Sequence, residues 1–263
     1  MLTVATYNLL HGLHLAERGR LDLAAAAEVI AGLGADVVAV QEVDRGLARS
    51  GGIDQVAWIA AQLGWHGVFA PALAGDPETA WRAIPGTDPG GPAYGVGLLS
   101  PHRLVDPMRL LLPGGGDGER KRQASLRNAG WDREPRVALR AHVALPSGPL
   151  AVTTTHLSYL PWRGVNQLRR AAAWATDRDR PAVLVGDLNL PARPVRALVN
   201  GWTHAEGPPT YPSWSPRLQI DQLLLRGLAV AGIRVGERAT SDHLPLVADL
   251  VAAPLPSESP GRR

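Results

Sequence analysis

The feature that most constrains this chain is a set of six short apolar or β-branched runs that each end abruptly in polar side chains. In one of them, residues 183–185 are too few for a helix and predict a buried strand, which delivers Asp187 and Asn189. Residues two apart on an extended chain point the same way, so these two side chains project together. A carboxylate beside a carboxamide suits orienting a water molecule and receiving its proton. For one such site alone, turn residues that hydrogen-bond their own backbone are the simpler explanation.

Five other runs repeat the pattern, and the repetition argues against turn chemistry alone. They are residues 4–8 ending in Asn8, 37–42 ending in Glu42, 152–156 ending in His156, 218–221 ending in Asp221, and 239–243 ending in Asp242 and His243. If these strands lie side by side, their polar ends meet at one rim, where open sheets commonly place their sites. Together they would supply an oxygen-rich metal site, a water-orienting pair and two imidazoles.

Length and composition limit the architecture. The 263 residues are enough for one large domain. A rule of roughly one domain per 150 residues would predict two domains, but proteins built from two packed sheets often exceed that length in a single domain. We therefore expect a single catalytic domain over residues 1–251 and a disordered Pro- and Ser-rich tail over residues 252–263. The chain has no cysteine, which excludes disulfides, thiolate nucleophiles and Cys-based zinc sites.

No targeting or membrane segment is recognisable. The N-terminus enters a strand without a basic region or an apolar segment of secretory length. No run approaches the roughly 20 apolar residues that a membrane span requires. A soluble, cytoplasmic and monomeric protein is expected.

The sequence pI near 9.8 is weak evidence for a nucleic-acid partner, because the net charge is only +3. Lys121 is the only lysine, and such a replacement of lysine by arginine reflects genome base composition more than a binding surface. Residues 119–122 with Arg127 form the only basic cluster. It would either contact phosphates or lie in a solvated loop, and the second interpretation is favoured.

Periodicity predicts a strand-rich chain with a few covering helices. Apolar stripes predict helices over residues 23–33, 56–63, 165–175 and 195–199. Strands are expected at residues 2–7, 37–40, 66–70, 94–100, 108–112, 136–143, 150–155, 183–185, 220–225, 229–235 and 246–250. Two Pro/Gly-rich segments, residues 71–92 and 113–134, are expected to be long loops without regular structure. The order of elements recurs loosely after residue 152, which indicates two similar halves.

Two further sets of side chains are ambiguous. His11 and His14 are three residues apart, as metal ligands on a helix can be, but the intervening glycine favours a structural or peripheral role. Trp81, Trp131 and Trp162 are candidates for lining the mouth of a substrate site, although tryptophan more often serves packing.

Seven motifs together carry a resemblance to a known family. They are Thr6-Tyr-Asn8, Gln41-Glu42-Val-Asp44, Tyr94-Gly-Val-Gly-Leu-Leu-Ser100, Thr155-His156-Leu, Gly186-Asp187-Leu-Asn189, Ile220-Asp221 and Ser241-Asp242-His243. In order and spacing they resemble the endonuclease/exonuclease/phosphatase superfamily, the deoxyribonuclease-I-like hydrolases, over nearly the whole chain. The resemblance implies an α+β fold, a four-layer α/β/β/α sandwich of two packed, mainly antiparallel sheets with outer helices. It also implies divalent-metal-dependent cleavage of phosphoesters.

The resemblance assigns the metal ligands. Glu42 corresponds to the principal Mg²⁺ ligand, with Asn8 beside it and Asp242 close to the metal region, and Mn²⁺ is an alternative ion. Magnesium takes carboxylate oxygens, keeps several waters and lets a substrate phosphate complete an octahedron, so the chemistry of these residues agrees.

The catalytic roles are implied in the same way. Asp187 would be the base or positioner for the attacking water, and Asn189 would hold that water or a phosphoryl oxygen. His243, paired with Asp221, would hydrogen-bond the phosphate and stabilise charge that develops on it. His156 would be a second phosphate contact or a proton donor toward the leaving oxygen.

The residues that would contact the substrate match the family's pattern less well. Arg136 and Tyr94 correspond to positions that often line the phosphate pocket, and Trp162 is expected near its mouth. Relatives often have asparagine and arginine where this chain has Val96 and Pro101, which puts a phosphate contact from that strand in doubt.

Several functional classes compete with this assignment. A serine hydrolase is disfavoured by the absence of a Gly-x-Ser-x-Gly elbow, and a zinc peptidase by the absence of His-Glu-x-x-His. A non-catalytic binding module on this fold remains an alternative, but a decayed site would have lost some of the motif residues, and all are present. Among enzymes, a phosphodiesterase or phosphatase for a small or lipid-like phosphoester is slightly favoured over a nuclease acting on DNA or RNA. Fold-level analogy cannot separate these two.

Overall fold

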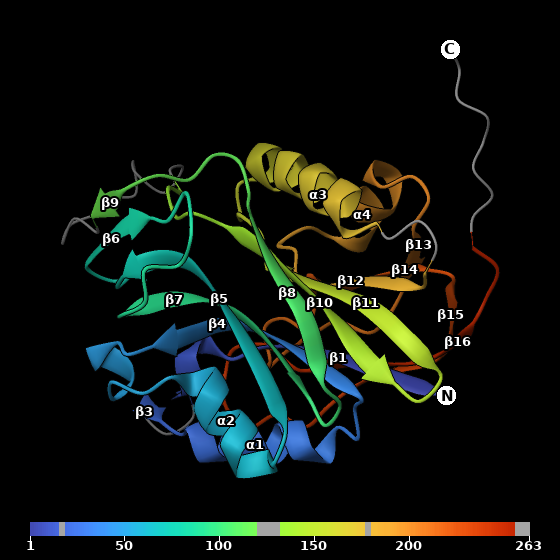
Figure 1. Cartoon of the computed structure of the whole chain (residues 1–263), viewed down its shortest axis with the longest axis horizontal. Helices are drawn as coiled ribbons and strands as arrows, with labels where there is room; N and C mark the ends of the chain where they lie inside the picture. The colour runs from blue at the N-terminus through green and yellow to red at the C-terminus, as the bar shows by residue number, and fades with distance from the viewer. Residues whose placement is uncertain (16–18, 120–131, 177–179, 256–263) are drawn as a thin grey trace.

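An eight-stranded sheet forms one inner layer of the molecule in the computed structural model, which describes residues 1–15, 19–119, 132–176 and 180–255 (Figure 1). From edge to edge its strands are β15 (Leu228–Val235), β16 (Leu246–Ala252), β1 (Leu2–Asn8), β4 (Val37–Arg45), β7 (Ala93–Ser100), β5 (His66–Gly75), β6 (Ala80–Ala83) and β9 (Gly118–Glu119).

A six-stranded sheet forms the second inner layer. Its strands, again from edge to edge, are β13 (Thr203–Ala205), β14 (Asp221–Arg226), β12 (Ala182–Asp187), β11 (Gly148–His156), β10 (Val137–Leu145) and β8 (Leu104–Leu111). A separate two-stranded ribbon pairs β2 (Leu13–His14) with β3 (Arg20–Leu21). Of these elements, β2, β3 and β13 were not expected from the sequence.

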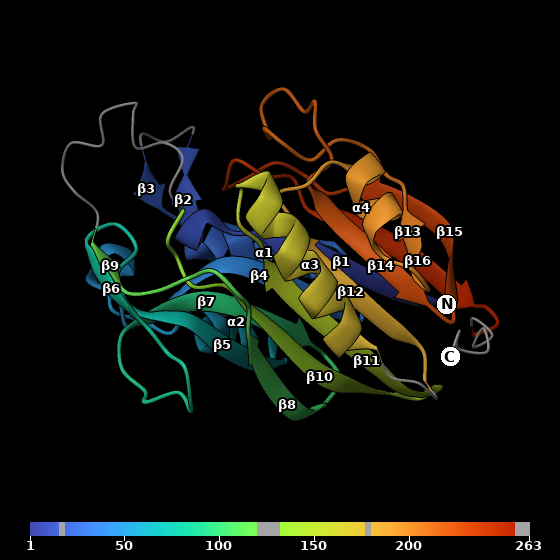
Figure 2. The same ribbon diagram turned by 90° about the horizontal axis from the view of Figure 1, so that it is seen from above.

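Helices cover the outer face of each sheet (Figures 1 and 2). The first sheet is covered by α1 (Leu23–Gly32) and α2 (Gln55–Leu63), and the second by α3 (Pro161–Ala175) and α4 (Ala192–Leu198). The side chains of Asp22 and Asp54 cap α1 and α2 by accepting hydrogen bonds from backbone N–H groups three residues on. Both helices end near a glycine with positive φ, as the sequence predicts. Strands and helices therefore stack in four layers.

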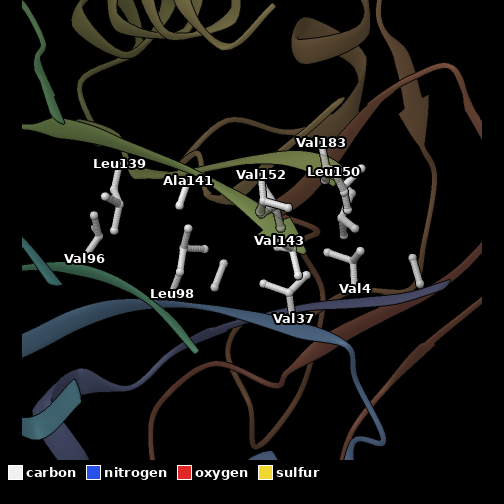
Figure 3. Close-up of a cluster of buried hydrophobic side chains, with 14 of the residues drawn as sticks. Val4, Val37, Val96, Leu98, Leu139, Ala141, Val143, Leu150, Val152 and Val183 are labelled. Carbon is white, nitrogen blue, oxygen red and sulfur yellow. The ribbon is translucent and has the colours of Figure 1, made fainter. Parts of the chain in front are cut away.

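The main core lies between the two sheets, as Figure 3 shows. Strand β4 explains why its run of sequence is apolar throughout. Val37 and Ala39 face the core between the sheets, whereas Val38 and Val40 face the outer helices, and all four are buried. A strand with both faces covered cannot alternate between apolar and polar residues. The predicted four-layer sandwich is confirmed.

Each sheet contains one parallel pair joined through a helix, and the other pairs are antiparallel. In the first sheet β1 and β4 are parallel and are connected through α1, and in the second β11 and β12 are parallel and are connected through α3. This repetition accounts for the two similar halves indicated by the sequence.

The two segments expected to be irregular contain strands, so that prediction is wrong. Strand β5 continues past Pro71 to Gly75, and β6 lies within residues 71–92, while β9 lies within residues 113–134. The physical reason is pairing between distant segments. The second part of β5 pairs with β7 and β6, and β9 pairs with β6, so these strands form without a local apolar period.

Some sequence features fall outside the part of the chain that the structure describes. They are most of the basic cluster at residues 120–122 with Arg127, Trp131, and residues 256–263 of the tail. Among the described helices, none is long and apolar enough to cross a membrane.

Candidate functional site

Three polar residues on adjacent strands of the second sheet lie in one row. In the strand register Asp187 is the partner of His156 on one side and of Asp221 on the other. His156 and Asp187 end buried strands and Asp221 begins one, so the core fixes the backbone that positions all three. The first sheet brings Asn8 and Glu42 to the same end, because parallel pairing sets Asn8 opposite Gln41. The predicted convergence of strand ends is therefore present in the structure.

Glu42 lies at an irregularity of β4. The register between β4 and β7 shifts between Gln41 and Val43, and Glu42 has a left-handed φ of 53°. A bulge of this kind turns one side chain out of the regular alternation, and such strained residues are often functional. Burial, together with the charge of Asp242, raises the pKa of Glu42.

Asn8 links the two sheets. Its amide nitrogen donates to Glu42 Oε1 at 3.0 Å and to Asp187 Oδ2 at 3.1 Å, and its Oδ1 accepts from the Leu10 N–H at 3.0 Å. Because both amide hydrogens are used on carboxylates, the orientation of Asn8 is determined by its partners. One buried side chain thus ties the expected metal ligand to the expected catalytic carboxylate.

Asp187 is 2% exposed and is held by donors on both oxygens. Besides the bond from Asn8, its Oδ1 accepts from the backbone N–H of Asn189 at 2.9 Å. Burial, with the nearby charge of Asp221, raises the pKa of Asp187 to about 7, although His243 and the hydrogen bonds oppose that rise. A carboxyl group with this pKa can accept a proton near neutral pH.

His243 lies between two buried carboxylates. Its Nδ1 is 2.8 Å from Asp221 Oδ2, and its Nε2 is 3.6 Å from Asp187 Oδ2. Thr210 donates a short hydrogen bond to the same oxygen of Asp221. Burial alone would lower the pKa of His243, but Asp221 and Asp187 outweigh it and raise the pKa to about 10. The imidazole is therefore cationic at neutral pH.

His156, in contrast to His243, is a neutral imidazole. The Asn189 amide nitrogen donates to the Leu157 carbonyl at 2.9 Å and lies 3.1 Å from His156 Nε2. As a donor, this nitrogen makes His156 Nε2 the acceptor and leaves the hydrogen on Nδ1. Burial, with the charges of Arg136 and His243, keeps the pKa of His156 well below its ordinary value. The buried Nδ1 has no hydrogen-bond partner among the described residues and lies 4.0 Å from Glu42 Oε1.

A cavity of about 620 Å³ opens over these groups. Of the residues singled out in the sequence, it is lined by Glu42, Tyr94, Arg136, His156, Asp187, Asn189, Asp242 and His243. Asn8 and Asp221 lie behind that surface as fully buried partners. Trp162, by contrast, is 64% exposed at the start of α3 and is not among the residues that line the cavity. Trp81 packs over Gly118, donates to the Gly116 carbonyl, and is not among the residues that line the cavity.

Several lining residues were not proposed as site residues from the sequence: Leu10, Arg49, Pro77, Glu78, Glu134, Tyr159, Pro191, Tyr211, Leu218 and Ile220. His11, which was given a peripheral role, also lines the cavity. Most of these residues lie in loops, where no period marks an inward-facing position. Among them, Tyr211 lies against His243, and the centroids of the two rings are 5.0 Å apart.

Two groupings of side chains could hold a metal ion. Asp187, Asp221 and His243 have ligand atoms within 4.8 Å of one another. In that group, however, the imidazole holds a proton and spans two carboxylates, and a metal-bound imidazole must give up that proton. The second grouping is Glu42 with Asn8 and Asp242. Here burial and the charge of Asp242 raise the pKa of Glu42, and a hard cation bound to its carboxylate would oppose that rise.

The sequence matches the model of one protein family, described as the Endonuclease/Exonuclease/phosphatase family, over residues 5–243. No curated protein matches this chain.

Solved structures show the same fold. An endonuclease/exonuclease/phosphatase from Beutenbergia cavernae has 23% sequence identity and a TM-score of 0.75, with 97% of this chain and 72% of that chain covered. The mannosyl-6-phosphatase of Bacteroides thetaiotaomicron has 17% identity and a TM-score of 0.63, covering 95% and 100%. TDP2 of D. rerio, complexed with a single-strand DNA product, has 16% identity and a TM-score of 0.62, covering 95% and 99%. At these identities the likeness concerns the fold alone.

Proposed function

Because the chain belongs to the endonuclease/exonuclease/phosphatase family, we propose that it is a divalent-metal-dependent hydrolase of phosphoester bonds. The observation that carries this proposal is the row of His156, Asp187 and Asp221 at the end of the second sheet. Together with His243, which Asp221 holds at 2.8 Å, this row places a proton-accepting carboxylate, Asp187, between a neutral and a cationic imidazole. A hydrolase that attacks phosphorus with water needs this combination of base and charge stabilisation.

Glu42, Asn8 and Asp242 are the residues that we propose as the metal site, with Mg²⁺ as the ion and Mn²⁺ as an alternative. Glu42 and Asp242 would supply carboxylate oxygens, which suit a hard ion, and Asn8 orients Glu42 through its amide N–H. When bound, such an ion supplies Lewis-acid polarisation of a phosphoryl oxygen. The buried Asp/Asp/His group is a competing site, which we disfavour because His243 is already held as a cation by its two carboxylates.

The protein's own residues then perform the remaining tasks. Asp187 accepts the proton of the attacking water, and its carboxylate is oriented by the Asn8 amide and the Asn189 backbone N–H. Asn189 also holds His156 with Nδ1–H free to donate a hydrogen bond to a phosphate oxygen or to the leaving oxygen. The cationic His243 stabilises negative charge that develops on the phosphoryl group.

Two substrate classes remain candidates. A phosphodiester or phosphomonoester of a small or lipid-like alcohol is favoured, because the cavity volume of about 620 Å³ is in the range of sites for small ligands and the chain carries little net charge. A nuclease is the alternative, because TDP2, which shares the fold, has been solved with a DNA product. The mannosyl-6-phosphatase with the same fold provides the corresponding precedent for a small phosphoester. Arg136 and Tyr94 are proposed to line the phosphate pocket in either case.

Glu42→Gln tests the metal assignment, because it keeps the side-chain shape and removes the charge that the ion needs. We expect weaker Mg²⁺ binding by calorimetry and a loss of kcat/KM of roughly two orders of magnitude or more. The assay is a panel of phosphomonoesters, phosphodiesters, phospholipids, DNA and RNA, measured with Mg²⁺, with Mn²⁺ and with a chelator. Glu28→Gln, on the exposed face of α1, is the matched control and should change neither quantity. Full activity in chelator would refute the proposed metal dependence.

A further inference from the structure

Thr210 is a buried residue that contacts the site, although the sequence does not single it out. It lies in the segment between β13 and β14 and is fully buried. Its hydroxyl donates a hydrogen bond to Asp221 Oδ2, the same oxygen that lies 2.8 Å from His243 Nδ1. A row of three groups therefore runs from the hydroxyl through the carboxylate to the imidazole.

The backbone of Thr210 is fixed by hydrogen bonds on both sides. Its N–H donates to the Leu218 carbonyl at 2.9 Å, and its carbonyl accepts from the Leu244 N–H at 2.9 Å. Leu244 directly follows His243, so the second bond joins the segment of Thr210 to the segment that carries the imidazole. The ring of the neighbouring residue, Tyr211, also lies against His243. The contacts that position His243 therefore also position the Thr210 hydroxyl.

The two oxygens of Asp221 are used unequally. Both donors meet at Oδ2, whereas Oδ1 is buried and has no hydrogen-bond partner among the described residues. A carboxylate oxygen accepts through about two lone pairs, so the Thr210 hydroxyl occupies one and leaves the other for His243. Because both donors share one oxygen, a partial rotation of the carboxylate would weaken both bonds at once, in a buried place where unpaired polar groups are costly. Thr210 thus restrains the orientation of Asp221.

The orientation of Asp221 in turn determines where the other nitrogen of His243 points. The two nitrogens belong to one planar ring, so holding Nδ1 at Asp221 directs Nε2, which lies 3.6 Å from Asp187 Oδ2. A group that stabilises charge in a reaction must be held within about 0.5 Å and 10–20° of its productive geometry. Threonine hydroxyls can bond to nearby backbone groups, but Thr210 bonds to the carboxylate that already holds this imidazole.

We propose that Thr210 is a positioning residue, which acts through Asp221 to hold the imidazole of His243 against the phosphoryl group of the substrate. Thr210 is not among the residues that line the cavity, so its effect on the reaction is indirect. The inference rests on the proposed function, because it takes His243 to stabilise charge on the phosphoryl group. The restraint of Asp221 and His243 can be measured without a substrate.

Two variants of Thr210 separate its hydroxyl from its shape. Thr210→Val keeps the branched side chain and removes the hydroxyl, whereas Thr210→Ser keeps the hydroxyl. With any phosphoester that the protein hydrolyses, we expect Thr210→Val to lower kcat about tenfold and to change KM much less, because charge stabilisation is lost mainly in the transition state. Thr210→Ser should restore kcat to within about threefold of the wild-type value. Thr176→Val, which removes a hydroxyl bonded to the Ala172 carbonyl at the end of α3, is the matched control and should leave kcat unchanged.

Hydrogen exchange measured by NMR tests the restraint without turnover. In the wild-type protein, the Nδ1–H proton of His243 should exchange slowly with water, because it is buried and bonded to Asp221. In Thr210→Val we expect this proton to exchange about tenfold faster, while the backbone N–H of Leu184 in β12 keeps its wild-type rate. A general loss of stability would accelerate both.

A double-variant cycle shows whether Thr210 acts through Asp221. If it does, adding Thr210→Val to Asp221→Asn should lower kcat by only about twofold or less, whereas independent effects would multiply. If Thr210→Val does not fold, the wild-type protein still provides a test, because the buried Thr210 hydroxyl proton should be visible and slow to exchange.

Four results would overturn the proposal: unchanged kcat and exchange in Thr210→Val, equal impairment of Thr210→Ser and Thr210→Val, multiplying effects in the cycle, or a Thr210 hydroxyl proton that exchanges freely in the wild-type protein. A lack of turnover on every phosphoester would instead count against the proposed function. In that case the exchange rates alone would decide whether Thr210 restrains His243.

Discussion

His243 has a carboxylate beside each ring nitrogen, and this position predicts its titration. Because its pKa is raised to about 10, the native protein holds the proton more tightly than the unfolded chain, whose histidine pKa is about 6.5. The stability that this contributes is fully present below about pH 6.5 and is lost as the pH rises to about 10. In chelator, the free energy of unfolding in urea should therefore fall over that interval.

NMR of the imidazole nitrogens would check the assignment directly. His243 should remain protonated at neutral pH, and Asp221→Asn should lower its titration midpoint because the closest carboxylate is neutralised. Asp106→Asn, at an exposed and distant carboxylate, is the control and should leave the midpoint unchanged. A midpoint for His243 that does not move in Asp221→Asn would contradict the pairing.

At the residue scale, the sequence could predict the site residues that lie at the ends of strands, but not those that lie in loops. Asp187 and His156 follow apolar runs, and their row on adjacent strands is a consequence of strand pairing. Arg49 reaches the cavity from a short 3₁₀ helix, and Glu78 and Tyr211 reach it from connecting segments, all on paths that depend on contacts formed only in the folded protein. The hydrogen bond that sets the tautomer of His156 is likewise a tertiary contact without a sequence signature.

At the scale of a single element, the end of β12 depends on one glycine. Gly186 pairs with Thr155 on β11 and has a φ of 146°, and a Cβ added there would overlap the Thr155 carbonyl oxygen. Gly186→Ala should therefore destabilise the protein by about 2–4 kcal/mol and lower kcat by moving the adjacent Asp187.

Urea unfolding and steady-state kinetics would measure the two effects. Gly32→Ala provides the matched control, because this glycine ends α1 with ordinary φ and has no atom within 4 Å of an added Cβ. It should be neutral or stabilising by up to about 1 kcal/mol. Equal stability of the two variants would show that the close approach of β11 and β12 does not limit residue 186.

The elements missed in the sequence are those that need a distant partner. Strand β9 has two residues, and it exists because it pairs with β6, more than thirty residues earlier in the chain. The second part of β5 follows a proline and a register shift, which hide its strand character. By contrast, α1 and α2 carry their own caps and apolar stripes, so local sequence is enough to predict them.

For the molecule as a whole, the order of strands could not be derived from local sequence. Strand β1 lies between β4 and β16, and its pairing with β16 joins the two ends of the described chain. The four-layer architecture was predicted only through the resemblance of the motifs. It is confirmed because both faces of each sheet are buried, against the other sheet on one side and helices on the other.

Whole-molecule charge gives the last prediction, which concerns nucleic acid. Protein groups that neutralise phosphates of B-DNA release counterions, and log affinity then falls with log salt by roughly 0.9 per contact. The chain has a net charge of +3, and the two arginines that line the cavity, Arg49 and Arg136, are already paired with carboxylates. We therefore expect a shallow slope for duplex DNA, of about one or two contacts, in fluorescence anisotropy titrations between low and physiological salt.

Replacing Arg120, Lys121 and Arg122 with glutamine should change that slope little if the favoured assignment is right. A steep slope that this triple variant abolishes, together with nicking of plasmid in Mg²⁺ and no turnover of small phosphoesters, would instead make the protein a nuclease.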